Sequence, residues 1–220
     1  MKYKCLILDH DDTVVNSTAT IHYPSFIAYL EHARADRVKN YTLESFILKN
    51  FTPGILSLFR DELGLSDAEL DEEQGFWENF VQTRIPVAYD GMRQIIERFI
   101  SEGGIVAVAS HSMTGFIKRD YEHNRLPAPH RIFGWDMPKE LRKPNPFAAE
   151  EIIREFGFSK SDILMVDDLK PGFDMARSAG IDFAAAGWGY DVPEIEAFMR
   201  KHSDYYLKTT EDLSALLFGE

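Results

Sequence analysis

Short, largely apolar runs mark the strands of this chain. They stand at residues 3–8, 105–109, 163–166, 183–186 and 205–207, and a shorter candidate stands at 132–133. Uninterrupted runs of this length are typical of strands that are buried on both faces of a parallel sheet. We therefore expect these runs to form one central sheet.

Helical periodicity fills the segments between these runs from residue 86 onward. Apolar residues recur there every three or four positions, and three of the expected helices end at glycines, at positions 103–104, 157 and 180. Thr209 and Asp212 form a capping pair that opens a C-terminal helix. Strands that alternate with helices predict an α/β fold, with a Rossmann-like parallel sheet core and helices on both faces.

The segment from residue 21 to about residue 84 contains no convincing strand. Apolar residues recur there at helical spacing in three stretches, 25–32, 43–51 and 53–63. Ser66 and Glu69 form a capping box that opens a further helix. We interpret this region as an inserted all-helical module. The predicted organisation is a core of residues 1–16 and 86–220 and a helical cap of residues 17–85.

Composition narrows the range of partners. The 220 residues carry 24 Lys and Arg against 36 Asp and Glu, a net charge of −12, which argues against binding nucleic acid or an anionic membrane through bulk charge. No apolar run reaches membrane-spanning length, and the single cysteine, Cys5, excludes a disulfide framework. We expect a cytoplasmic monomer or homodimer with no nucleic-acid or membrane partner.

Polar residues gather where the expected strands end. Asp9, Asp11 and Asp12 follow the first apolar run, Ser110 follows the run at 105–109, and Asp167 with Asp168 follows the run at 163–166. Parallel strands end at one edge of a sheet, where open α/β sheets bind their ligands. Clustered carboxylates repel one another unless a divalent cation or a shared proton compensates. The first acidic turn, considered alone, is equally consistent with a solvated loop.

These residue types together suit phosphoryl transfer. Asp9 and Asp11 are two positions apart on a strand end, so both side chains lie on one side, where one serves as nucleophile and the other moves protons. Asp167 and Asp168 add hard oxygen ligands that suit Mg²⁺. The Ser110 hydroxyl, together with Lys143 from a loop, would meet the charge of the phosphoryl oxygens.

The same residues resemble the motifs of the haloacid dehalogenase-like phosphohydrolases. That family has a D-x-D-x-T motif, a Ser or Thr after a strand, a Lys often in K-P-x-P, and an acidic pair after a later strand. This chain carries all four in family order: Asp9, Asp11 and Thr13; Ser110; Lys143 before Pro144; and Asp167 with Asp168. Four motifs in order, over nearly the whole chain, make a specific resemblance.

The resemblance implies a role for each motif residue. Asp9 would attack phosphorus to form an aspartyl-phosphate, and Asp11 would protonate the leaving oxygen and then activate water. Mg²⁺ would be held by Asp9, the backbone carbonyl of Asp11, and Asp168, with help from Asp167. Ser110 and Lys143 would hold the phosphoryl oxygens. The helical insertion resembles the family's C1-type cap, which closes over the site and selects the substrate.

Several positions depart from the family pattern or lack an assigned role. Asp12 stands where the family usually has glycine, and we expect its side chain to point outward while its backbone N–H faces phosphate. His111, Lys49 and Asn50 are further candidates for substrate contact. His22, near the start of the insertion, is expected to be a solvated histidine.

The function predicted from these observations is Mg²⁺-dependent hydrolysis of a small phosphorylated metabolite through an aspartyl-phosphate. A phosphomutase of the β-phosphoglucomutase type shares the motifs and the cap and remains an alternative. A phosphonatase would need a cap lysine as a Schiff base, a role open to Lys49. A receiver-like phospho-accepting switch combines similar residues, but there the acidic pair precedes the phosphorylated aspartate in the chain. Dehalogenation is disfavoured because it does not need the second aspartate or the metal ligands.

Overall fold

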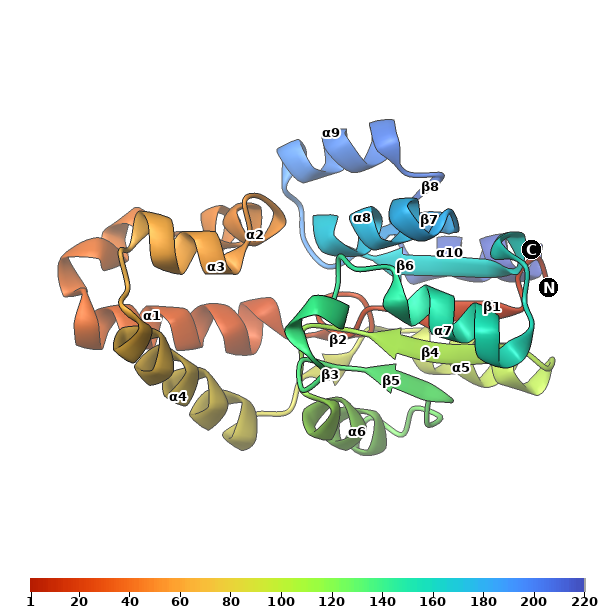
Figure 1. Ribbon diagram of the computed structural model, residues 1–220, viewed down its shortest axis with the longest axis horizontal. Coiled ribbons are helices and arrows are strands. Elements are labelled where there is room, and N and C mark those ends of the chain that lie inside the picture. Colours follow the sequence, from red (N-terminus) through yellow and green to blue (C-terminus); the bar gives the residue numbers. More distant parts are fainter. Residues whose placement is uncertain (220) are drawn as a thin grey trace.

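The computed structural model describes residues 1–219 and contains a six-stranded sheet with a separate group of helices at one end (Figure 1). The strand order is β5-β4-β1-β6-β7-β8, and every neighbouring pair is parallel. The strands are β1 Cys5–Leu8, β4 Ile105–Ala109, β5 Arg131–Phe133, β6 Ile163–Asp167, β7 Asp182–Ala186 and β8 Tyr205–Leu207. The α/β fold and the parallel sheet predicted from the apolar runs are confirmed.

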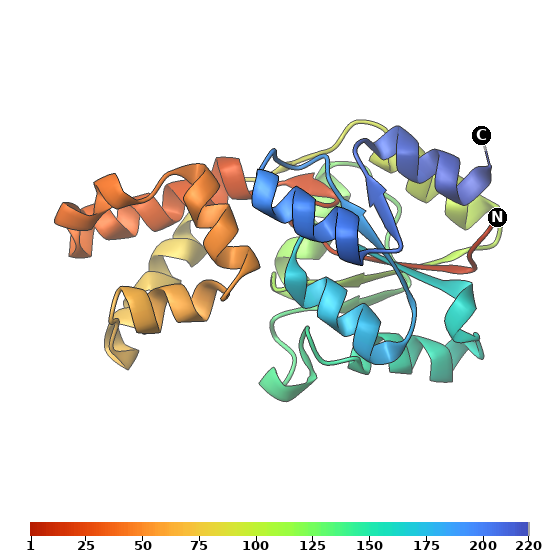
Figure 2. The same ribbon diagram turned by 90° about the horizontal axis from the view of Figure 1, so that it is seen from above.

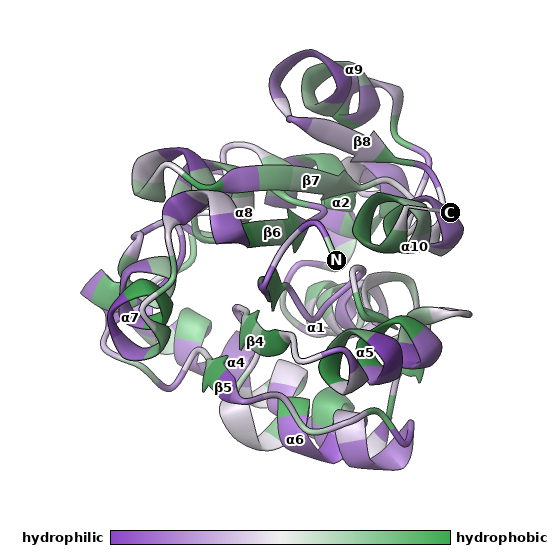
Figure 3. Cartoon of the chain, turned by 90° about the vertical axis from the view of Figure 1, so that its right-hand side faces the viewer, coloured by the Kyte–Doolittle hydropathy of each residue, from purple (hydrophilic) through white to green (hydrophobic). Residues whose placement is uncertain are grey.

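Helices cover both faces of this sheet (Figure 3). One layer is α5 (Met92–Ser101), α6 (Thr114–His123) and α10 (Thr210–Phe218), and the other is α7 (Phe147–Phe156), α8 (Lys170–Ala179) and α9 (Pro193–His202). Alternation along β1 shows why both layers are needed. Leu6 and Leu8 pack into the first layer, and Cys5 and Ile7 into the second, all four without solvent exposure.

A second group of helices lies beyond the carboxyl ends of the strands (Figures 1 and 2). It consists of α1 (Tyr23–Ala33), α2 (Leu43–Phe51), α3 (Ile55–Ser57) and α4 (Asp67–Thr83), with π-helical turns at Thr18–His22 and Leu58–Glu62 and a 3-10 helix at Ala35–Asn40. Aromatic side chains form its own core. The rings of Phe26 and Phe46, for example, stack with centroids 4.8 Å apart. We refer to these helices as the cap.

A two-stranded antiparallel sheet joins the cap to the core. β2 (Val15–Asn16) pairs with β3 (Val87–Ala88), so the outgoing and returning connections lie side by side. This pair and α9 were not predicted from the sequence. The division into residues 1–16 with 86–220, and 17–85, stays a prediction, and its two boundaries fall beside this pair. Within residues 1–219, no helix is both long and apolar enough to cross a membrane.

Candidate active site

The carboxyl end of β1 lies where the strand order reverses. β4 flanks β1 on one side and β6 flanks it on the other, and the chain passes from one half of the sheet to the other between β5 and β6. Open α/β sheets bind ligands in the crevice at such a switch point. Asp9 follows β1 there, Ser110 follows β4, Asp167 ends β6, and Asp168 comes directly after it.

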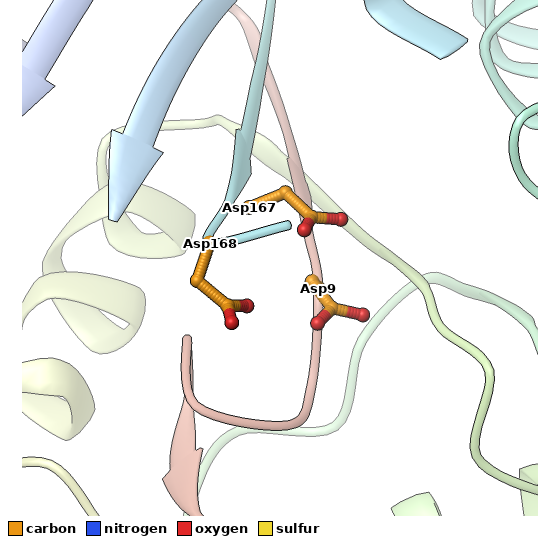
Figure 4. A group of neighbouring side chains, drawn as sticks. All are labelled: Asp9, Asp167 and Asp168. Carbon is orange, nitrogen blue, oxygen red and sulfur yellow. The ribbon is translucent and has the colours of Figure 1, made fainter. Parts of the chain in front are cut away.

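Three buried carboxylates, those of Asp9, Asp167 and Asp168, approach one another at this point (Figure 4). One oxygen of each lies within 4.8 Å of the others, and none of the three residues is more than 4% exposed. Burial raises the pKa of Asp167 to about 7, against the opposing charge of Lys143. Burial, then the charges of Asp167 and Asp9, raise the pKa of Asp168 well above its usual range. The trio therefore favours either a proton or a cation.

Lys143 places an ammonium group among these carboxylates. Its Nζ donates to Asp9 Oδ1 at 2.7 Å and to Asp167 Oδ2 at 2.5 Å, and the side chain is 5% exposed. Burial opposes the charge, but the two carboxylates outweigh burial and hold the pKa of Lys143 above its usual range. Gly172 of α8 gives Asp167 its space, because a Cβ atom there would lie 2.1 Å from Oδ2.

The donor set of the trio fits a hard divalent cation. Carboxylate oxygens are the ligands that Mg²⁺ prefers, and a +2 charge would favour the ionised forms of all three groups. Thr13 donates to Asp168 Oδ1 at 3.1 Å and the Tyr190 hydroxyl to Oδ2 at 3.0 Å, so the Asp168 carboxylate is held in orientation. Asp11 is not part of the trio, and its predicted metal contact through the backbone carbonyl stays a prediction.

The Asp11 carboxylate sits in a separate network of donors. Oδ1 accepts from Ser17 Oγ at 2.7 Å and from His22 Nε2 at 3.0 Å. Oδ2 accepts from Ser112 Oγ at 2.6 Å and more weakly from Ser110 Oγ at 3.4 Å. Burial opposes ionisation, but the attraction and hydrogen bond of His22 outweigh it and hold the pKa of Asp11 below its usual range. Its environment therefore differs from that of the trio, although Asp9 is only two residues away.

His22 connects this network to the cap. Its Nδ1 accepts a hydrogen bond from the indole N–H of Trp77 in α4 at 3.0 Å, while Nε2 faces Asp11. An indole N–H is a donor only, so the hydrogen received by Asp11 is carried on Nε2. The expectation of a solvated histidine is wrong, because the imidazole is 18% exposed and stacks on Trp77. The cause is the π-helical turn Thr18–His22, a geometry frequent at functional sites.

Asp12 differs from its expected orientation. Its side chain is 4% exposed and accepts from the backbone N–H groups of Ser17 at 3.3 Å and Thr18 at 3.2 Å. Its own N–H donates to the carbonyl of Val15 at 2.7 Å, so it does not face phosphate as predicted. The reason is a left-handed backbone with φ of 53°, which turns the carboxylate inward. Burial raises the pKa of Asp12 to about 6. Asp12 thus organises the start of the cap, and its contact with substrate stays a prediction.

Ser110 and His111 follow β4 and line the same cavity as Asp9. Ser110 Oγ accepts the backbone N–H of Ser112 at 3.1 Å. His111 Nε2 lies 3.0 Å from the carbonyl oxygen of Lys143, and burial holds the pKa of His111 below its usual range. Their predicted contacts with phosphate or substrate remain predictions.

A cavity of about 370 Å³ extends from the core site into the cap. Asn50 lines it, and its Nδ2 donates to the carbonyl of Phe46 at 2.9 Å. Lys49 does not line it, because its ammonium group pairs with the Glu62 carboxylate and is 30% exposed. Neighbouring residues of a helix point about 100° apart, so Lys49 and Asn50 do not share a face. The structure therefore keeps Asn50 as a candidate contact and leaves Lys49 outside the cavity.

Sequence reasoning missed several residues of this site. Three of them hydrogen-bond to Asp11 directly, namely Ser17, His22 and Ser112. Trp77 contacts Asp11 indirectly, through His22, and Tyr190 donates to Asp168. Ser112 follows the apolar run at 105–109, so its place at a strand end was a usable signal. The others come from the cap and from the loop after β7, and no local sequence pattern predicts that they lie at this site.

A comparison with known proteins identifies the family that has this arrangement of residues. Residues 6–186 match the family model of the haloacid dehalogenase-like hydrolases. The chain belongs to this family. It is therefore an enzyme of a hydrolase family, as the four motifs predicted, and the cap helices lie between the first and second motifs.

Individual relatives of this hydrolase are distant. A phosphoglycolate phosphatase of Aliivibrio fischeri is 28% identical over 107 residues, which are 48% of this chain and 47% of that protein. The chain thus spans about half the length of the curated relative it matches. A predicted phosphoglycolate phosphatase from Haemophilus somnus is 18% identical with a TM-score of 0.76, over 99% of both chains. A hydrolase from Deinococcus radiodurans, crystallised with phosphate and sodium, is 16% identical with a TM-score of 0.72, over 98% and 95% of the chains. These structures share the fold.

The buried carboxylates predict how stability of the metal-free hydrolase depends on pH. The pKa of Asp167 is about 7 in the folded state, against about 3.9 in an unfolded chain. Because this pKa is raised in the folded state, protonation of Asp167 contributes to the free energy of unfolding. The contribution is fully present below about pH 4 and is lost as the pH rises through about 7. Asp11 has the opposite shift, so its contribution is constant above about pH 5.

We expect the unfolding free energy in EDTA to fall by a few kcal/mol between pH 5 and pH 8. Urea unfolding at both pH values, with EDTA or with Mg²⁺, measures it. Mg²⁺ should restore stability at pH 8 and do little at pH 5. A metal-free protein that is more stable at pH 8 would contradict the assignment of raised pKa values to this site.

The link from Trp77 through His22 predicts a kinetic effect. His22→Gln removes the imidazole that orients the Asp11 carboxylate, so kcat for p-nitrophenyl phosphate at pH 7 should fall on the order of ten-fold or more. Trp77→Phe keeps an aromatic ring but removes the indole N–H, and a smaller loss in the same direction is expected. His32→Gln, at an exposed cap histidine paired with Glu72, is the matched control. Equal kcat for wild type and His22→Gln would exclude this role.

Proposed function

We propose that this protein is a Mg²⁺-dependent phosphatase that hydrolyses a small phosphorylated metabolite through an aspartyl-phosphate on Asp9. One observation carries the proposal. The Asp9 carboxylate lies 2.7 Å from the Lys143 ammonium and beside Asp167 and Asp168, at the floor of a cavity that the cap covers. The names of two relatives, one a phosphoglycolate phosphatase and one a predicted phosphoglycolate phosphatase, support the reaction class without defining the substrate.

In the first step, an oxygen of Asp9 attacks phosphorus. Oδ1 accepts from Lys143, and within residues 1–219 no side-chain donor is bonded to Oδ2, which leaves that oxygen for the new bond. The bond from phosphorus to the substrate oxygen breaks, and its electron pair stays on that oxygen. Asp11 supplies the proton to it, which requires Asp11 to have taken up a proton beforehand. His22, Ser17 and Ser112 hold the Asp11 carboxylate in place for this transfer.

In the second step, Asp11, now ionised, removes a proton from water. The water oxygen attacks phosphorus, the bond to Asp9 breaks, and inorganic phosphate and the Asp9 carboxylate are released. A pKa of Asp11 below its usual range keeps the carboxylate in the ionised form that this step requires. Lys143 and Ser110 offset charge on the phosphoryl oxygens in both steps.

A bound Mg²⁺ would supply charge neutralisation at the phosphoryl oxygens and would be held by Asp9, Asp168 and the Asp11 carbonyl, with Asp167 assisting. We include a cytoplasmic location and a monomer or homodimer in the proposal as expectations from the sequence. A mutase would be distinguished by isomerisation of a sugar phosphate without net release of phosphate.

Chelation tests this proposal. With p-nitrophenyl phosphate at pH 7, we expect hydrolysis in Mg²⁺ and a loss on the order of 100-fold in EDTA, because the incoming phosphate would otherwise meet the acidic trio without the charge of the cation. Added Mg²⁺ should restore the rate. Undiminished hydrolysis in EDTA by protein stripped of metal would contradict a metal-dependent mechanism.

A further inference from the structure

The cap half of the cavity is apolar and aromatic. Its walls include the side chains of Phe26, Phe46, Phe59, Leu70 and Trp77, from four different cap segments. The volume of about 370 Å³ lies in the range that accommodates ligands larger than a few atoms. Flat rings line such walls well, because aromatic faces pack offset or edge-on against other rings.

The same cavity lacks a cation for a second anionic group. Among the described residues that line it, Lys143 is the single Lys or Arg, and its ammonium group is already bonded to Asp9 and Asp167. The cap contributes two acidic lining residues instead, Asp71 and Glu73. A carboxylate on the organic part of a substrate would thus be desolvated without a cationic partner, beside acidic side chains.

Glu73 gives a second, independent reason to expect a ligand group in the cap half of the cavity. Its side chain lines the cavity, is 8% exposed, and has no hydrogen-bond partner within residues 1–219. It stands four residues before Trp77 in α4, so both side chains lie on the same face of that helix. Burial raises the pKa of Glu73 to about 7, with an opposing contribution from His22. A buried carboxyl group without a partner is costly, and a ligand that bonds to it would remove this cost.

Resting on the proposed phosphatase function, we propose that the substrate is a phosphate monoester whose organic part is uncharged, contains a ring, and carries a hydroxyl or N–H group that hydrogen-bonds to Glu73. The aromatic walls would pack against the ring, and the phosphate would lie at Asp9. A two-carbon carboxylate such as glycolate matches neither the apolar walls nor the acidic cap residues.

Three esters test this assignment with wild-type protein and Mg²⁺. Adenosine and uridine 5′-monophosphates carry uncharged ring-bearing groups with donors, phosphoglycolate carries a small anionic group, and p-nitrophenyl phosphate reports hydrolysis as such. We expect kcat/KM for the better nucleotide to exceed that for phosphoglycolate at least ten-fold. Phosphoglycolate as the better substrate would overturn this inference while leaving the phosphatase proposal intact. Absence of Mg²⁺-dependent hydrolysis for all three would overturn both.

Variants at position 73 separate a binding role from a structural one. Glu73→Leu removes both carboxyl oxygens, so it should lower kcat/KM for the nucleotide at least five-fold more than for p-nitrophenyl phosphate, which offers no donor. Glu73→Lys should raise the ratio of phosphoglycolate to nucleotide hydrolysis at least ten-fold. Glu72→Gln, at the exposed neighbouring position, should leave both ratios unchanged. Equal losses for all esters in both Glu73 variants would show that Glu73 only supports the fold, and the inference would fail.

Discussion

Asp9→Asn is expected to lower kcat for p-nitrophenyl phosphate by about 10⁴-fold or more, because the amide is not a nucleophile at phosphorus. The substitution is close to isosteric, and Asn keeps an oxygen that can accept from Lys143. A folded but inactive protein is therefore the expected product. Steady-state hydrolysis at saturating Mg²⁺ measures the loss, and far-ultraviolet circular dichroism checks the fold.

Asp36→Asn provides the control for this substitution. Asp36 lies in the cap, its side chain is 79% exposed, and its closest cation is Arg37, so wild-type activity is expected. If Asp9→Asn retained a tenth or more of the wild-type kcat, then Asp9 would not be the nucleophile.

Lys143→Met is expected to reduce both stability and activity. The ammonium group is buried and bonded to two carboxylates, so its removal leaves Asp9 and Asp167 facing each other without compensation. Breaking a buried ion pair in this way costs about 3–5 kcal/mol. Hydrolysis should also fall on the order of 10²- to 10³-fold, because a positive charge near the phosphoryl oxygens is lost.

Urea unfolding in EDTA at pH 8 measures the stability change. The loss should be smaller at pH 5, where Asp167, with a pKa of about 7, holds a proton that replaces part of the missing charge. Lys4→Met is the matched control, since Lys4 pairs with Asp162 at the surface and is 65% exposed, and it should cost no more than about 1 kcal/mol. Equal costs for the two variants would mean that Lys143 contributes no more than a surface charge.

The core of the fold follows from local sequence because each strand is a continuous apolar run. The runs at 105–109 and 163–166 became β4 and β6 with at most one residue of difference. β2 and β3 are two residues each and pair across more than 70 positions of chain, so no local pattern marks them. α9 was missed because its buried side chains, Ile195 and Met199, give a weak periodic signal among charged residues.

The site residues also divide into those that local sequence predicts and those that only the structure brings together. Asp9, Lys143 and Asp168 were predictable because their chemistry and their positions after strands coincide. His22 and Trp77 are 55 residues apart and meet only when α4 folds against the start of the cap, so their contact required the structure. Asp12 was assigned the wrong orientation because an inward carboxylate beside a phosphate site is unfavourable, whereas the left-handed backbone there lets it accept from the N–H groups of Ser17 and Thr18.

Covalent phosphorylation of Asp9 tests the central claim most directly. Asp11→Asn removes the base that activates water, and p-nitrophenolate leaves without a proton from Asp11, so the intermediate should accumulate in this variant. Protein mixed with p-nitrophenyl phosphate and Mg²⁺, quenched in acid and digested, is examined by mass spectrometry. The account predicts one phosphoryl group on the peptide that contains Asp9, removable by hydroxylamine. Release of p-nitrophenolate without a covalent adduct, or an adduct on another residue, would contradict it.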